Sequence, residues 1–542
     1  MSDIDGSVDM DENDGEMGGV LRQKSAGIED VVFGIMYTVT KEKYSDKTFD
    51  YLAIFIDFMQ LFAIIIGENF NWDFNSDHWF WRWVFRFNIQ VPVIEQGYGF
   101  FLACFYVLVF MLIGSVGLCV FVGLCFKNNT FPYVWPIKLL RFFVSLFFGV
   151  FYISSLSIFM VSVDCEIKGQ DVPRLETFPD KPCFEGGQLI HLTVAIVMSV
   201  LFMIIGYFME EAQTELTPIS DEFMATPSSF VRVREFIFKT VLTIVSAVLS
   251  SYPRVQGLLM MCTTVGLYYN LVRYSPYYNE TCTKVRALLY AILGWCSFCL
   301  CMMAFFFNDN TFYITIVMFS GMLPSAVIGY IAAGWRVRFS RRLALEVLYG
   351  EGKQALAKNK WVDMNEVEVF SRVCRLRDDE GELIEDNVDM AEQLLKQGLE
   401  AFPTSAYLHI VYSSFLLVLR DKMRQSVTML DKARDLDPDL GQRFQIFVRE
   451  REFKQQQQGE STGEGAMDLV SYVEFQKNYR MLLHSHRAAL QGTRNFWRQL
   501  MRSDVNFRHL SGAFVRMDKI ETSASSTYKV VLERYPKSVK LM

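Results

Sequence analysis

The chain has 542 residues, of which 51% are hydrophobic and 15% aromatic, and its mean hydropathy is +0.19. This composition excludes a chain made only of ordinary soluble domains, and it indicates a membrane protein. The net charge of −7 is unremarkable as a total, and we expect no nucleic-acid partner.

The N-terminal end is acidic. Met1–Glu16 holds seven acidic residues and no basic residue, which predicts a disordered tail over residues 1–27. The basic start and early apolar core of a secretory signal are missing, so we expect a cytoplasmic N-terminus. Residues 28–48 form an amphipathic stretch that ends in Lys41 and Lys43. It fits a juxtamembrane helix at the cytoplasmic lipid surface, and equally an ordinary helix on a soluble domain.

Residues 49–335 hold long apolar runs of roughly twenty residues each, the length that spans a bilayer. We predict an all-α fold: a polytopic transmembrane bundle of about eight helices. The predicted spans are Phe49–Gly67, Tyr98–Phe126, Val134–Val163, Gln188–Met209, Phe236–Ser251, Val255–Tyr274, Lys284–Phe307 and Phe312–Trp335.

Positive charges predict the orientation. They concentrate in one set of connections, which includes Lys127, Arg232 and the basic exit at 336–342, whereas the opposite loops mix few bases with acids. Because basic loops stay in the cytoplasm, this set should be cytoplasmic. An even number of spans puts both termini there.

Residues 164–187 form a polar loop on the predicted outer side, and this loop contains Cys165 and Cys183. An outer compartment permits disulfides, so we predict that the two pair; two unrelated thiols are the alternative. The cysteines in the apolar runs read as small hydrophobes, and we predict no metal site.

Two residues inside predicted spans are charged and deep. Asp57 and Arg141 would both lie about 10–12 Å from the cytoplasmic surface at 1.5 Å per residue. A carboxylate at that depth is expensive and needs a partner. We predict an intramembrane ion pair between them, which either has a functional role or only orders the bundle. Pro324 should kink the last span; such a hinge could pass motion to the cytoplasmic part or serve packing alone.

After a juxtamembrane helical connector over 336–390, the sequence repeats itself. The stretch Ala391–Pro438 is similar to itself at an offset of 35 residues. This offset is close to the period of about 34 residues of tetratricopeptide (TPR) repeats. We predict TPR-like repeats over 391–458, then further helices and an incomplete third repeat over 459–542. An incomplete repeat leads us to expect a fragment of a longer polypeptide. The repeat-defining residues are Ala391, Leu395, Gly398, Pro403, Leu430, Ala433, Pro438, Leu532 and Pro536.

Three segments resemble the tiny-macrocysts family of multi-pass membrane proteins with TPR-type repeats. They are LLKQGLEAFPTSAYLHIVYSSFLL (Leu394–Leu417), RFQIFVREREFKQQ (Arg443–Gln456) and YKVVLERYPKS (Tyr528–Ser538). The resemblance implies longer members with further spans and, in some, sensory or cyclase modules. It carries over no catalytic residue.

These patterns predict a multi-pass membrane sensor or scaffold whose cytoplasmic repeats bind a protein partner, as part of a larger signalling protein. An ion channel or transporter is the alternative, resting on the spans and on Asp57. The sequence lacks phosphate-binding glycine loops and metalloprotease motifs, so we expect neither catalysis nor a cofactor. The pattern does not indicate a small-molecule ligand.

Overall fold

The computed structural model describes residues 29–40, 47–127, 135–349, 363–462, 469–501 and 507–534, apart from short internal gaps. Those gaps are at 30, 38, 68–69, 71, 74–78, 167–172, 307–310 and 378–382. The chain divides into two compact units, residues 1–123 with 139–446 and residues 124–138 with 447–542.

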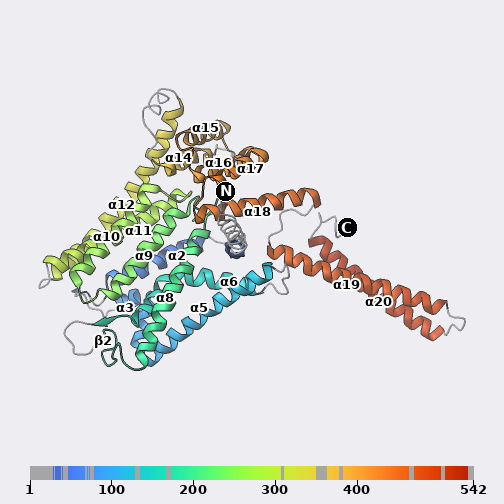
Figure 1. The fold of residues 1–542 in the computed structure, drawn as a ribbon, viewed down its shortest axis with the longest axis horizontal. Helices are drawn as coiled ribbons and strands as arrows, with labels where there is room; N and C mark the ends of the chain where they lie inside the picture. Colours follow the sequence, from blue (N-terminus) through green and yellow to red (C-terminus); the bar gives the residue numbers. More distant parts are fainter. Residues whose placement is uncertain are drawn as a thin grey trace, which may run out of the picture. The chain divides into compact units, whose positions relative to one another are not determined.

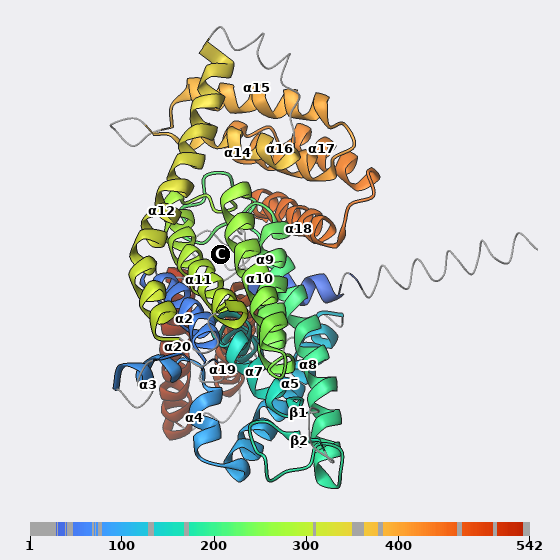
Figure 2. The same cartoon turned by 90° about the vertical axis from the view of Figure 1, so that its left-hand side faces the viewer.

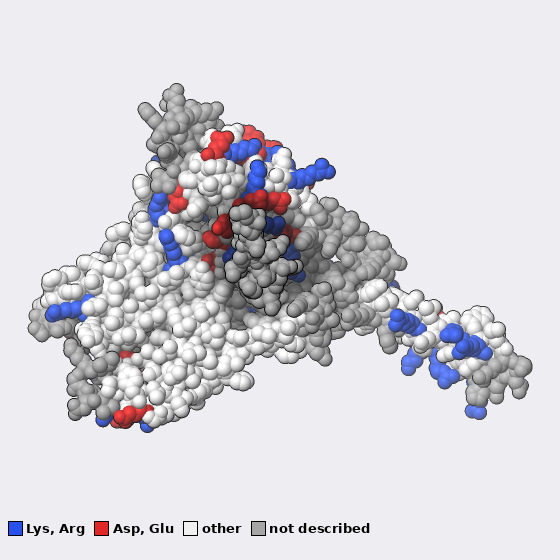
Figure 3. All heavy atoms as spheres, viewed as in Figure 1, with Lys and Arg blue, Asp and Glu red and all other residues white. Residues whose placement is uncertain are grey.

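The first unit is built on a helical bundle (Figure 1). The face seen in Figure 3 has a broad area with few Lys, Arg, Asp or Glu side chains. The bundle helices are α2 (Lys47–Ile65), α5 (Tyr98–Lys127), α6 (Trp135–Val144), α7 (Tyr152–Val161), α8 (Gly187–Ala212), α9 (Ser229–Val248), α10 (Pro253–Tyr274), α11 (Glu280–Phe306) and α12 (Thr311–Tyr349).

Among the described helices, six are long and apolar enough to span a membrane, and the bent pair α6–α7 forms either a broken seventh span or a re-entrant loop. The prediction of about eight spans also counted α9, which is not among these candidates. Four charged residues, Arg232, Arg234, Glu235 and Lys239, lie within α9 and lower its hydropathy. The helix packs against α7, α8 and α10, whose contacts shield part of it from lipid.

The third predicted span is broken. Ser145–Val150, the segment η1, is a π-helix that follows α6, and the chain bends by 76° before α7 begins. Phe151 at the break has φ −107° and ψ 21°, outside the helical region. π-Helical turns are rare and are frequently found at functional sites.

Helices α10, α11 and α12 lie side by side in both ribbon views (Figures 1 and 2). Small residues allow their close approach: a Cβ added at Gly329 of α12 would lie 2.5 Å from the Cβ of Ala291 on α11. Pro324 lies inside α12, which continues through it as one helix. The sharp break in this bundle is therefore at Phe151, and the hinge at Pro324 stays a prediction.

One end of the bundle carries short elements between the long helices. They are α3 (Trp79–Phe85), α4 (Gln90–Glu95) and a two-stranded antiparallel ribbon of β1 (Cys165–Glu166) and β2 (Arg174–Leu175). The structure joins Cys165 to Cys183 in a disulfide, with Cα atoms 6.2 Å apart. We call this end the disulfide side.

The opposite end of the bundle carries a helical-repeat domain, and we call it the repeat side (Figure 2). Its core combines residues of several helices, including Val367, Leu395 and Phe415. The helices are α14 (Met364–Ser371), the 3₁₀ turn η2 (Arg372–Arg375), α15 (Glu385–Ala401), α16 (Ala406–Arg420), α17 (Met423–Asp435) and the start of α18 (Leu440–Thr462).

The repeat pattern corresponds to packing in these helices. Leu395 and Gly398 of α15 are buried, and so are Leu430 and Ala433 at the positions shifted by 35 residues in α17. Ala391 of α15 is also buried. Gly398 lets α14 approach closely, because a Cβ there would lie 2.3 Å from Val367 Cγ1. Pro403 and Pro438 follow the ends of α15 and α17, where a residue without an amide proton is tolerated.

In the second unit, α19 (Leu469–Leu500) and α20 (Phe507–Arg534) pack along one another. A Cβ at Gly492 of α19 would lie 3.4 Å from Ile520 Cδ1 of α20. Leu532 of the predicted third repeat lies near the end of α20, and Pro536 lies outside the described residues.

Candidate functional site

Asp57 of α2 pairs with Lys239 of α9, whose Nζ lies 2.7 Å from Asp57 Oδ2. The predicted pair with Arg141 is therefore wrong: none of the ion pairs between described residues joins Asp57 to Arg141, which lies on α6. Similar depth in the membrane does not fix which helix is the neighbour. Helix α2 packs against α9 and α11, and these two helices supply the bases.

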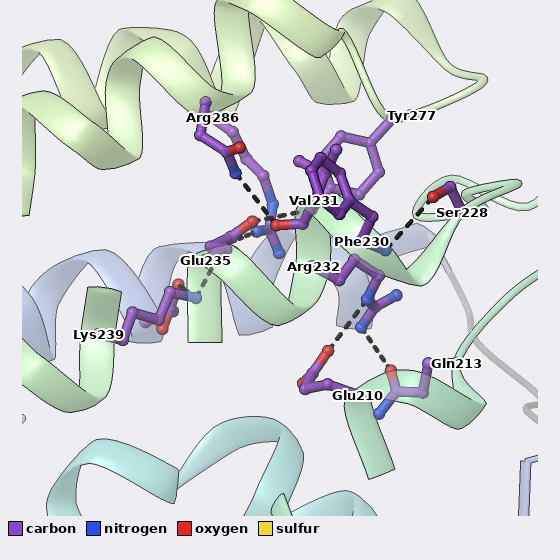
Figure 4. Close-up of polar contacts among 12 residues, drawn as sticks. Glu210, Gln213, Ser228, Phe230, Val231, Arg232, Glu235, Lys239, Tyr277 and Arg286 are labelled. Atoms are coloured by element: carbon purple, nitrogen blue, oxygen red, sulfur yellow. Dashed lines mark hydrogen bonds and ion pairs between the residues drawn. The ribbon is translucent and has the colours of Figure 1, made fainter. Parts of the chain in front are cut away.

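The centre of the charged site is Glu235, one turn before Lys239 on the same face of α9. Its Oε1 lies 2.9 Å from Lys239 Nζ and also accepts hydrogen bonds from Arg286 and from the Tyr290 hydroxyl. Figure 4 shows Arg286 reaching Glu235 from the neighbouring helix. A carboxylate with three donors is satisfied despite burial, since charge-assisted hydrogen bonds offset desolvation.

A second ion pair lies on the same face of α9. Arg232 Nε donates to Glu210 Oε2 at 3.1 Å and Arg232 Nη2 to Gln213 Oε1 at 2.5 Å, which ties α9 to the end of α8 (Figure 4). The two ion-pair groups thus join α2, α8, α9 and α11 across one region of the bundle.

These charges line a cavity of about 100 Å³. Four acidic and three basic side chains contribute to its wall, together with residues of the π-helix η1 and of α2. Charged groups at such a depth are expensive and mark functional sites by default. The charged lining residues are Asp50, Asp57, Glu210, Glu235, Arg232, Lys239 and Arg286.

Gln60, one turn after Asp57 on α2, also lines the cavity and is only 1% exposed. Its Nε2 donates to the carbonyl oxygen of Val150 at 3.1 Å, at the end of η1. Because Val150 offers an acceptor, the amide nitrogen must face it, and this fixes the orientation of the amide. Gln60 Oε1 is then buried without a hydrogen-bond donor among the described residues.

The loop between α10 and α11 connects the charged site to the repeat domain. The ring of Tyr277 lies under the Arg286 guanidinium, 5.0 Å from centroid to Cζ, and its hydroxyl lies 3.5 Å from Glu235 Oε2. On the other side, Arg372 of η2 donates to the carbonyl oxygens of Ser275, Pro276 and Tyr277 at 2.8, 3.3 and 2.9 Å.

The next residue, Tyr278, completes this connection. Burial raises the pKa of the Tyr277 and Tyr278 hydroxyls well above the usual value, so both stay protonated and act as donors. Tyr278 donates to the Glu215 carbonyl at 3.4 Å, and its ring lies near the guanidinium groups of Arg372 and Arg375. The loop is thus held from both sides.

Two further contacts fix the repeat domain to the bundle. Glu366 of α14 accepts from Arg273 at the end of α10, at 2.7 Å, and from Arg336 of α12, at 3.3 Å. Arg375 donates to the carbonyls of Pro218 and Ser220 in the loop between α8 and α9. The repeat helices are therefore bonded to α10, α12 and both neighbouring loops.

The disulfide side has a larger cavity of about 340 Å³, lined in part by Asp164, Glu176 and Gln256. Asp164 accepts from Thr177 at 3.4 Å and from Ser250 at 3.5 Å. Burial, together with the nearby Glu176 carboxylate, raises the pKa of Asp164 to about 8. Within the described ranges, no group of three or more His, Cys, Asp or Glu side chains is arranged to hold a metal.

Glu235, Lys239, Arg286 and Arg372 were not predicted as site residues. A signal was present for the first two: Glu and Lys four residues apart in an apolar run can satisfy one another and still face a third group. Arg286 and Arg372 could not be found this way. Their partners are 51 and about 96 residues away in the sequence.

Long apolar helices together with a helical-repeat domain are consistent with a membrane protein that carries a repeat domain. The family described as "TmcB, TPR repeats" matches residues 452–542. The chain is homologous to tiny macrocysts proteins C and B of Dictyostelium discoideum, at 24% identity to each, which confirms the resemblance seen in the sequence. The alignments cover 94% and 96% of this chain and 40% of each relative, so the chain spans less than half of their length. No solved structure matches the chain.

Proposed function

We propose that the chain is a membrane-anchored sensor or scaffold that presents its helical repeats to a protein partner in the cytoplasm. The observation that carries the proposal is the loop Ser275–Tyr278, which contacts the buried Glu235–Arg286 pair on one side and Arg372 of the repeat domain on the other. A change at the charged site alters the position of Tyr277, and Arg372 transmits this change to η2 and α14.

The basic connections favour a cytoplasmic repeat domain and cytoplasmic termini. Helical repeats bind extended protein segments and rarely catalyse, so the proposal includes no enzymatic activity.

Hydrogen exchange tests the coupling in the full chain in lipid nanodiscs. Glu235→Gln keeps the size of the side chain and removes its charge. We expect faster exchange in 275–278 and in Met364–Ser371, because Lys239 and Arg286 lose their common partner. Arg234→Gln is the matched control: Arg234 lies on the same helix, is exposed, and contacts Tyr274 and Phe230. Unchanged exchange in α14 in the Glu235 variant would refute the coupling.

Photo-crosslinking tests the partner. A photoreactive residue at Arg424, exposed on α17, should give a discrete protein adduct in native membranes. The same residue at Phe110, 77% exposed on the apolar helix α5, should give lipid adducts. If Arg424 yields no protein adduct that Phe110 lacks, the scaffold half of the proposal fails.

An ion channel or transporter is a second candidate, and the broken span favours it. Discontinuous helices beside a polar cavity are a common arrangement at ion sites in transporters. Here the break at Phe151 adjoins the cavity that contains Asp57. Selective flux in proteoliposomes that Asp57→Asn abolishes would establish transport, and equal flux in empty liposomes would exclude it.

A further inference from the structure

The cavity beside Asp57 presents oxygen atoms that lack donors. Lys239 bonds to one carboxylate oxygen of Asp57, Oδ2, and no described residue donates to the other, Oδ1. Gln60 Oε1, one turn away on the same face of α2, is buried and likewise has no donor among the described residues. Burying an acceptor without a donor costs about 1–3 kcal/mol, so a bundle selected only for packing would avoid Gln60 here.

We propose that this cavity binds a small monovalent inorganic cation, with Asp57 and Gln60 as ligands and the Lys239 ammonium as a tethered competitor. The unpartnered groups on α2 are acceptors, which a hard cation prefers. Four acidic and three basic side chains line the space, so the local sum of charges is −1 and suits one positive charge.

The size of the cavity supports an ion over an organic molecule. A water needs roughly 10–15 Å³ of such space, so about 100 Å³ holds an ion with several waters. Those waters can also accept a hydrogen bond from Arg286 Nε, which is buried and lacks an acceptor within the described part of the chain. A divalent ion would need more carboxylates than remain beside three basic groups.

Lys239 makes the site a switch. Its ammonium group already contacts Asp57 and Glu235 at 2.7 and 2.9 Å. A cation bound at Asp57 repels this ammonium and shifts it toward Glu235, the residue that Arg286 and Tyr277 also contact. In this respect the inference rests on the proposed function, because it supplies the event that the loop Ser275–Tyr278 transmits.

The experiment measures the midpoint of thermal unfolding of the full chain in detergent. Lithium, sodium or potassium chloride is titrated against N-methylglucamine chloride at constant ionic strength. We expect a saturable rise with at least one of the three cations. Gln60→Leu should weaken the apparent affinity at least about tenfold, and Gln60→Glu should strengthen it, because it adds a charged ligand. Gln256→Leu, at a buried amide in the other cavity, is the matched control and should leave the affinity unchanged.

Lys239→Gln gives the second test. Removing the tethered ammonium should tighten cation binding by about tenfold or more, since a like charge close to the site is lost. No saturable rise with any of the three cations, or equal affinity in the wild type and the Gln60 variants, would overturn the inference. If Gln60→Leu does not fold, the cation affinity of Gln60→Glu still tests whether Gln60 is a ligand. The exchange response to Glu235→Gln does not require an added cation, so it shows separately whether the proposed coupling stands.

Discussion

Arg372→Ala should detach the repeat domain from the bundle locally without unfolding the bundle. The guanidinium donates to three loop carbonyls, Ser275, Pro276 and Tyr277, and to both oxygens of Glu368 at 2.9 and 2.7 Å. Alanine removes all of these bonds at once. Glu368, 4% exposed, then remains as a buried carboxylate without its main partner.

The magnitude follows from these contacts. Three carbonyl bonds to a charged donor contribute at least about 1 kcal/mol each. Leaving one member of a buried ion pair alone costs about 3–5 kcal/mol, which water entering the vacated space reduces. We therefore expect a loss of at least about 4 kcal/mol in the free energy of local opening of η2 and α14. This loss is comparable to the stability of a small domain, so the attachment should become labile.

Hydrogen exchange with mass spectrometry measures this loss directly. A change of about 4 kcal/mol lowers the protection of amides in Met364–Ser371 by about a thousandfold. Arg420→Ala is the matched control, because Arg420 bonds to Glu392 at 2.9 Å and to the exposed Asp389. It should cost only about 1–2 kcal/mol, confined to α15 and α16. Equal loss of protection in α14 in the two variants would refute the role of Arg372 as the link.

Three smaller predictions concern single groups. Because the folded-state pKa of Asp164 is raised to about 8, its protonated form contributes stability below its ordinary pKa, and this is lost as pH rises toward 8. A pH series of thermal midpoints should show this decline, and Asp164→Asn should flatten it. Replacing Cys165 and Cys183 with serine opens a loop closed over 18 residues, which should lower stability by about 3 kcal/mol. In the wild type, alkylation should label these two thiols only after a reductant is added. Gly398→Ala should cost about 1–3 kcal/mol by overpacking, whereas Gly512→Ala, with nothing within 4 Å of its added Cβ, should stabilise α20 by about 0.5–1 kcal/mol in urea unfolding.

Much of the fold could be predicted because it depends on local patterns. Apolar runs of membrane length gave the bundle, and the 35-residue self-similarity placed Leu395 and Leu430 at equivalent buried positions. The exceptions have a physical cause. Helix α9 carries charges that only its neighbours make tolerable, and the break at Phe151 lies in an apolar run with neither proline nor a charged residue beside it.

The charged site was predicted only in part. Asp57 and the need for a partner followed from the cost of a charge in lipid. Lys239 did not, because periodicity fixes the face of one helix and says nothing about which helix lies opposite. Arg372 was hidden for a similar reason: its importance comes from three carbonyl groups, which every sequence has and no side-chain pattern reveals.

The composition of the site separates function from stability. Where α10, α11 and α12 need only pack, they use small and apolar contacts such as Gly329 against Ala291. Buried ion pairs add little net stability, and apolar residues of equal volume often do as well. A bundle able to pack this way has no structural need for two basic groups and a tyrosine hydroxyl on Glu235. Nor does it need a buried Gln60 amide oxygen that has no donor among the described residues. Their position next to a broken helix and to the loop bonded by Arg372 is the arrangement expected of an input site, so variants that neutralise them should change coupling more than stability.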